Sequence, residues 1–171
     1  MTIDAEALYR NLLEQLRAAL EQGRAGDEGA ARIALIGVQT GGAWIAERLH
    51  RDLGLAADLG SLSSAFHRDD YGERGLPTTI RATEIGFPVD DAHIVLVDDI
   101  LFTGRTIRAA INEIFDYGRP RRIELAVLID RGGRELPFQA DHVGGVVPLA
   151  APARYVLSQE TSGRLAIRVE T

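Results

Sequence analysis

Three short segments composed almost entirely of apolar residues constrain the fold most. They are "RIALIGV" at 32–38, "IVLV" at 94–97 and "RIELAVLID" at 122–130. Continuous apolar runs of this length are typical of strands that are buried on both faces, as in parallel sheets. Apolar residues at helical spacing occur between them, over 43–54 and 106–117. This alternation predicts an α/β fold with a mainly parallel central sheet flanked by helices.

The rest of the chain adds shorter elements to this pattern. A helix is predicted over 4–22, a strand over 56–66, and short strands over 142–147, 153–158 and 164–169, the last two joined as a hairpin by Ser162 and Gly163. The polar segment 67–79, with two glycines and a proline, predicts a long mobile loop. The chain has 171 residues and no repeat or linker, so we expect a single domain over 1–171.

Composition limits the chemistry that this chain can perform. It has no cysteine and no lysine, all 19 basic residues are arginine, and the net charge is −6. A Walker A lysine and a lysine Schiff base are therefore excluded, and anions must be bound by arginine, backbone N–H groups, hydroxyls or a metal. No apolar run approaches the ~20 residues of a membrane helix, and the N-terminus does not resemble a signal peptide. We expect a cytoplasmic protein without membrane contact.

Two acids and a small-residue loop follow the second apolar run. Asp98 and Asp99 come after the predicted strand, and Thr103, Gly104 and Thr106 precede the predicted helix. The unpaired N–H groups of a helix start, with glycine and hydroxyls beside them, are suited to a phosphate. Adjacent carboxylates are suited to sugar hydroxyls or Mg²⁺. Each residue alone is also ordinary turn chemistry, but the block together predicts a site for a phosphorylated sugar.

The same block carries a family resemblance. "VLVDDILFTGRT" at 95–106 resembles the signature of type I phosphoribosyltransferases for phosphoribosyl pyrophosphate (PRPP). "FHRDD" at 66–70, "FDYGRPRRIELAVLIDRGGRELP" at 115–137 and "ADHVG" at 140–144 are similar to the PyrR family, which comprises bifunctional pyrimidine operon regulators and uracil phosphoribosyltransferases. The resemblance implies a type I phosphoribosyltransferase-like fold with a small hood and a mobile loop.

The resemblance also implies a reaction and a set of site residues. Uracil and PRPP would give UMP and pyrophosphate, with Mg²⁺ as cofactor. Asp98, Asp99 and Arg68 would be catalytic, and Asp98 and Asp99 would hold the metal through water or PRPP. PRPP or nucleotide would contact Thr40, Gly41, Gly42, Arg81, Asp98, Asp99, Ile100, Leu101, Phe102, Thr103, Gly104, Arg105 and Thr106. The base would lie against Ile129, Asp130, Arg131 and Val156.

One departure from the family pattern bears on pyrophosphate binding. The best-known members have a basic residue followed by Thr-Arg-Gly, whereas this chain has Gln39-Thr40-Gly41-Gly42. The missing arginine removes a charge partner for pyrophosphate. Arg68 and Arg81, beside the predicted loop, are candidates to replace it. An enzyme of the same fold acting on another base, such as a purine, stays an alternative.

Regulation through RNA is a further hypothesis from the resemblance. Segment 139–153 has no arginine or lysine where an RNA-binding surface is expected, and this weakens the expected phosphate contacts. A smaller basic patch is left, made of Arg119, Arg121, Arg122 and Arg134. A UMP-sensing RNA-binding regulator with weak or no catalysis is therefore the alternative to an enzyme. The resemblance implies a homo-oligomer, a dimer or larger.

Overall fold

A five-stranded parallel sheet forms the centre of the protein. The computed structural model describes residues 3–26, 33–63 and 82–171. The strands are β1 (Ile33–Val38), β2 (Asp58–Leu62), β3 (His93–Leu101), β4 (Arg122–Asp130) and β5 (His142–Val146), in the order β2-β1-β3-β4-β5. Every neighbouring pair is parallel. The predicted α/β fold with a parallel central sheet is confirmed.

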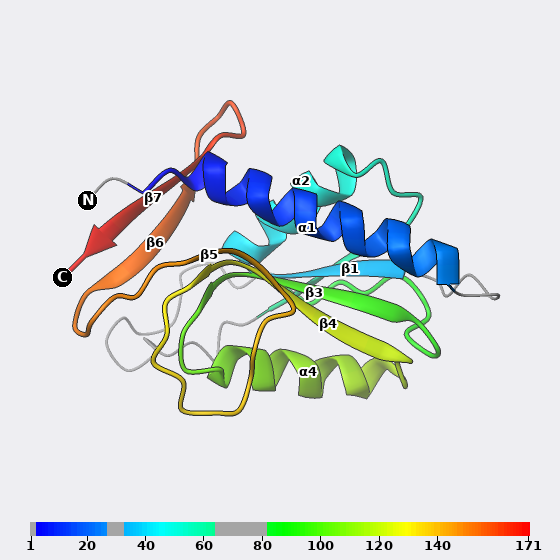
Figure 1. Ribbon diagram of the computed structural model, residues 1–171. Helices are drawn as coiled ribbons and strands as arrows, with labels where there is room; N and C mark the ends of the chain where they lie inside the picture. The colour runs from blue at the N-terminus through cyan, green and yellow to red at the C-terminus, as the bar shows by residue number, and fades with distance from the viewer. Residues whose placement is uncertain (1–2, 27–32, 64–81) are drawn as a thin grey trace.

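Helices cover both faces of this sheet. The helices α1 (Ala5–Gly26) and α2 (Gly41–Asp52) lie on one face, and α4 (Arg105–Tyr117) lies on the other (Figure 1). Alternate residues of a strand point to opposite faces. In β3, Val95 and Val97 belong to the core beneath α1 and α2, whereas Ile94 and Leu96 belong to the core beneath α4. The apolar runs in the sequence are continuous because both faces of the sheet are covered.

The order of the strands reverses between β1 and β3. From β1 the chain passes through α2 to β2 on one side, while β3 lies on the other side of β1. In open parallel sheets, ligands bind outside the carboxyl ends of the strands at such a reversal of order. The fold therefore predicts a ligand site at the segments that follow β1 and β3.

A two-stranded hairpin forms the predicted hood. The antiparallel strands β6 (Arg154–Gln159) and β7 (Leu165–Glu170) stand at the end of the molecule where the sheet strands finish (Figure 1). Tyr155, Leu157 and Leu165 are buried in the core beneath α1. The backbone N–H of Leu165 also donates to Glu6 Oε1 at 2.8 Å, which ties the hairpin to α1.

Three predicted elements have other boundaries in the structure. The strand predicted over 94–97 extends to Leu101, because its pairing with β4 continues through Ile100↔Ile129 and Leu101↔Asp130. Asp98 and Asp99 therefore belong to the strand. The helix predicted from residue 43 begins at Gly41. The strand predicted over 56–66 spans 58–62, and the loop predicted over 67–79 lies outside the described residues.

Among the described residues, no helix is both long and apolar enough to cross a membrane.

Candidate active site

The start of α2 is pressed against the carboxyl end of β3. A β-carbon on Gly41 would lie 2.3 Å from Asp99 Oδ2, and one on Gly42 would lie 2.4 Å from the carbonyl oxygen of Val97. Carbon atoms in contact normally stay ~3.5 Å or more apart. Only residues without a side chain permit this approach. The turn after β1 and the acids of β3, far apart in sequence, are thus neighbours in one site.

The two acids of β3 occupy different environments. Asp98 is buried, with 5% of its surface exposed, and its Oδ1 accepts a hydrogen bond from the N–H of Asp99 at 2.9 Å. Asp99 is half-buried and faces the start of α2 at Gly41. The pair therefore presents one fixed and one more accessible carboxylate beside the first turn of α2.

The loop after β3 leads directly into α4. Gly104 is the N-cap residue of α4 and has φ 93°, a left-handed conformation that favours glycine. A β-carbon there would also lie 3.1 Å from the ring of Phe138. Thr103 is buried, and its Oγ1 accepts a hydrogen bond from the N–H of Arg105 at 3.2 Å. The first turn of α4 contains no acidic residue, so its partial positive charge is available to an anion.

A second helix start points to the same region. Thr40, the N-cap residue of α2, is exposed, and the first turn of α2 is also without an acidic residue. The Gln39–Thr40 peptide bond is cis. Two positive helix ends, one after β1 and one after β3, thus flank the pair of carboxylates. This arrangement suits a ligand with phosphoryl groups at both ends and hydroxyls between them.

The segment after β4 packs onto the loop after β3. The carbonyl oxygen of Thr103 accepts hydrogen bonds from the N–H groups of Glu135 and Leu136, both at 3.0 Å. The carbonyl oxygen of Leu101 accepts one from the N–H of Arg131 at 3.1 Å. The predicted base segment and the predicted phosphate loop therefore form one packed unit.

Arg131 lies inside this unit. It is 6% exposed, its guanidinium lies 3.9 Å from the ring centroid of Phe102, and its Nη2 donates to the carbonyl oxygen of Leu149 at 2.8 Å. Gly133, at φ 78°, lets the chain pass over the same ring, since a β-carbon there would lie 2.5 Å from Phe102. The stack of Arg131 on Phe102 therefore holds the end of β4 against the loop after β3.

Arg134 is a residue whose role the sequence did not reveal. The sequence placed it in a basic surface patch, but its side chain points inward. Its Nε donates to the carbonyl oxygen of Phe138 at 2.8 Å, its Nη1 to that of Phe102 at 2.9 Å, and its Nη2 pairs with Asp130 Oδ2 at 2.5 Å. The acceptor at Phe102 is distant in sequence, so no local pattern could have indicated it.

The other residues predicted for the site do not all lie at it. Arg68 and Arg81 lie outside the described residues. Arg105 is exposed and pairs with Glu135, with Nη2 and Oε2 2.5 Å apart. Val156 lies in β6 opposite Arg168, on the face of the hairpin turned away from Tyr155.

The other arginines of the predicted basic patch also have protein partners. Arg121 pairs with Asp91 at 2.9 Å, Arg122 pairs with Glu124 at 2.6 Å, and Arg119 donates to the carbonyl oxygen of Phe115 at 3.1 Å. Together with the inward turn of Arg134, these contacts reduce the charge that the patch can offer to RNA.

The carboxylates fit a magnesium ion that is shared with a substrate. Mg²⁺ usually binds through one or two carboxylates together with waters and substrate phosphates. Asp98 and Asp99 offer that set of oxygen ligands. In the part of the chain that the structure describes, no group of three or more histidine, cysteine or acidic side chains forms a complete protein cage for a metal.

Comparison with known proteins agrees with this arrangement. The family described as "Phosphoribosyl transferase domain" matches residues 4–151. A hypoxanthine phosphoribosyltransferase from Staphylococcus aureus superposes with a TM-score of 0.64 at 17% identity, covering 86% of this chain and 77% of that one. A hypoxanthine-guanine phosphoribosyltransferase from Bacillus anthracis gives 0.63 at 20%, covering 86% and 81%. The likeness to these structures establishes a type I phosphoribosyltransferase fold.

The relatives in sequence are more similar. A protein named "Bifunctional protein PyrR" from Ralstonia nicotianae is 52% identical over 161 residues, covering 94% of this chain and 89% of the relative. A protein of the same name from Nitrosococcus oceani is 47% identical over 152 residues, covering 88% and 83%. The chain belongs to the PyrR family of type I phosphoribosyltransferases.

Proposed function

We propose that this protein transfers the phosphoribosyl group of PRPP to uracil, releasing UMP and pyrophosphate. The observation that carries the proposal is the convergence of Asp98 and Asp99 with the glycine start of α2 and the start of α4 at Gly104. Such a site suits a ligand that carries sugar hydroxyls between two phosphoryl groups, and PRPP has this arrangement. Membership of the PyrR family, whose resemblance implies a uracil phosphoribosyltransferase, supports uracil as the base.

The reaction exchanges one bond at the anomeric carbon of the ribose. The bond from C1′ to the pyrophosphate oxygen breaks, a bond from C1′ to uracil N1 forms, and the N1 proton is released. Positive charge develops on the sugar ring as pyrophosphate departs, as in glycoside chemistry. Asp98 and Asp99 hold the ribose hydroxyls and favour that charge. The N–H groups at the start of α4 hold the 5′-phosphate, and those at the start of α2 face the pyrophosphate.

We further propose that Asp98 and Asp99 hold Mg²⁺ together with PRPP. When bound, the ion neutralises pyrophosphate and favours its departure. The residues at 129–133 orient the base, since their loop is fixed to the phosphate loop by the hydrogen bonds at Leu101 and Thr103. Rigid connection of the two loops keeps base and sugar in line for displacement.

A nucleobase panel with PRPP and Mg²⁺ tests this proposal. We expect nucleotide formation with uracil, and we expect the double substitution Asp98→Asn and Asp99→Asn to lower kcat/KM by about 10³-fold, because both sugar contacts and the favourable charge are lost. Asp116→Asn, at an exposed position on α4, controls for the loss of a carboxylate outside the site and should retain activity. Product with hypoxanthine and none with uracil would reject uracil as the substrate.

Regulation of a pyrimidine operon through its leader RNA is the second candidate function. It is favoured by the word "bifunctional" in the name of the relatives. A gel-shift assay with the leader RNA of the chain's own pyrimidine operon, with and without UMP, tests it, and the absence of a UMP-dependent shift would remove this role. We also propose that the protein is a cytoplasmic homo-oligomer, a dimer or larger. Sedimentation-velocity centrifugation would measure the mass of this assembly.

A further inference from the structure

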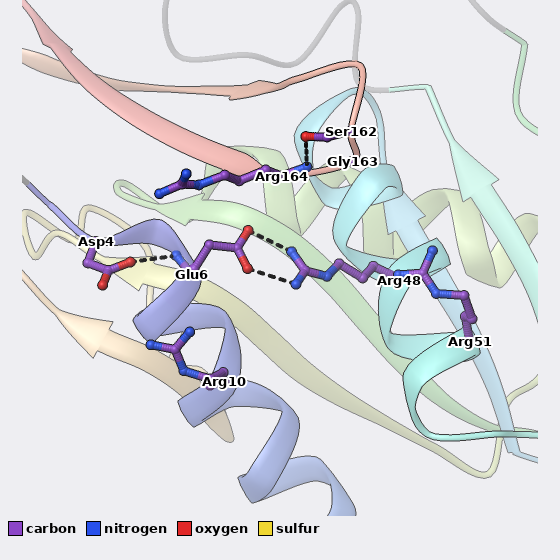
Figure 2. Close-up of a pocket in the computed structure, with 8 residues that line it drawn as sticks. All are labelled: Asp4, Glu6, Arg10, Arg48, Arg51, Ser162, Gly163 and Arg164. Atoms are coloured by element: carbon purple, nitrogen blue, oxygen red, sulfur yellow. Dashed lines mark hydrogen bonds and ion pairs between the residues drawn. The ribbon is translucent and has the colours of Figure 1, made fainter.

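A cavity of about 540 Å³ lies between the start of α1, the side of α2 and the turn from β6 to β7 (Figure 2). Six charged residues line it: Asp4, Glu6, Arg10, Arg48, Arg51 and Arg164. The residues that line this cavity include none of segments 39–42, 98–106 and 129–136. The cavity is therefore formed by parts of the chain that the proposed reaction does not use.

Both carboxylates of the cavity are committed to partners within the protein. Glu6 accepts two hydrogen bonds from Arg48, each at 2.7 Å, and one from the N–H of Leu165 at 2.8 Å. Asp4 Oδ1 accepts from the N–H groups of Glu6 at 3.1 Å and Ala7 at 3.0 Å, which caps the start of α1. Among the described residues, neither acid forms an ion pair with Arg10, Arg51 or Arg164.

Arg10 and Arg164 carry the excess positive charge. Four arginines and two acids give the lining a formal charge of +2. Within the described residues, neither guanidinium makes a hydrogen bond or ion pair, and Figure 2 shows the two side chains on either side of Glu6. The pKa of Glu6 is lowered to about 2, mainly by the hydrogen bond from Arg48, with a smaller contribution from the charge of Arg164. Glu6 therefore stays ionised and paired at neutral pH.

The wall between these arginines is rigid. The guanidinium of Arg48 lies 4.0 Å from the ring centroid of Tyr9. Tyr9 is buried, and its hydroxyl donates to Asp52 Oδ2 at 2.8 Å. Glu6, Tyr9 and Asp52 together hold Arg48 in place, so this side of the cavity is ordered without a ligand. Sites with side chains that are already ordered bind more tightly, because these side chains lose less conformational freedom on binding.

We propose that this cavity binds a phosphorylated small molecule of mononucleotide size, with Arg10 and Arg164 as the arginines that contact its phosphoryl group. Guanidinium groups match the geometry of phosphate oxygens and form charge-assisted hydrogen bonds with them. Ligand sites commonly measure ~300–1,000 Å³, so the cavity has room for more than a phosphate ion. The chain's net charge of −6 disfavours a continuous track for a nucleic-acid backbone and favours a small ligand.

Backbone amide NMR provides a position-specific test. Inorganic phosphate, AMP and a short single-stranded RNA are titrated separately into the full chain. The N–H signals of Glu6 and Arg164 report on the cavity, and those of Arg105 and Thr106 report on the proposed active site. The test variant is Arg10→Gln with Arg164→Gln. The control, Arg17→Gln with Arg168→Gln, removes the same charge from α1 and from the β6–β7 hairpin at positions outside the cavity.

The expected result is a saturable shift at Glu6 and Arg164 with phosphate or AMP, weakened at least tenfold in the test variant and unchanged in the control. Tighter binding of AMP than of phosphate would identify an organic phosphate as the ligand, and equal binding would identify the free anion. The proposal is overturned if these signals stay still at ligand concentrations that saturate the Arg105 and Thr106 signals, if the test variant binds as tightly as the wild type, or if only RNA shifts them.

Discussion

Replacing Arg134 by glutamine should both destabilise the protein and slow its reaction. The guanidinium makes three short contacts, to the carbonyl oxygens of Phe138 and Phe102 and to Asp130 Oδ2. A hydrogen bond to a charged group contributes about 1.5–3 kcal/mol. Since the side chain of Arg134 is 23% exposed, water replaces part of what is lost. We expect the free energy of unfolding to fall by about 2–4 kcal/mol, short of the full value of three such bonds.

The effect on activity follows from the same contacts. The carbonyl oxygen of Phe102 lies in the loop that leads to α4, and Asp130 ends β4 within the proposed base segment. Without Arg134 the two segments lose a shared anchor. A displacement of about 1 Å in a positioning group can lower the rate about 10²-fold, so we expect kcat/KM for uracil to fall by that order.

Two further variants separate the causes. Arg134→Lys keeps the charge but loses the fork geometry, so it should recover only part of both losses. Arg105→Gln breaks an ion pair whose side chains are 59% and 52% exposed, and it serves as a control for stability alone, with a loss below about 1 kcal/mol. Urea unfolding and steady-state assays measure both quantities. An Arg134→Gln protein with wild-type stability and wild-type kcat/KM would refute the reasoning.

Two other predictions follow from packing and charge. Gly42→Ala should lower the free energy of unfolding by about 1–3 kcal/mol, because its β-carbon would press on the backbone of Val97 at 2.4 Å; Gly86→Ala, where no atom lies within 4 Å, is the control, and equal losses in urea unfolding would contradict this account. The folded-state pKa of Glu6, about 2, lies below its ordinary value of 4.5, so the pair with Arg48 stabilises the fold fully above about pH 4.5 and progressively less as pH falls towards 2. The stability difference between wild type and Glu6→Gln should therefore shrink from pH 6 to pH 3 by about 1 kcal/mol in urea titrations, after screening by solvent; a constant difference would argue against the lowered pKa.

Local features of the sequence determined the architecture and the part of the candidate site that lies in the loop after β3. Apolar runs and helical spacing depend on neighbouring residues, so they predicted β1, β3, β4 and the helices within a few positions. The phosphate loop was also local, since the acids, Gly104 and the start of α4 follow one another along the chain. A contiguous segment largely fixes its own turn and helix start, and for this reason it could be predicted without the fold.

The tertiary structure alone decided which segments meet at that loop. Gly41 lies beside Asp99, and Arg134 turns inward to Phe102, because the strand order brings β1 and β4 to either side of β3. The end of β3 at Leu101 likewise depends on hydrogen bonds to β4. Contacts between distant residues follow from sheet order and close packing, which periodicity along the chain does not encode. The sequence indicated the chemistry of the site, and the fold determined which arginines hold the site together and which line the cavity beside α1.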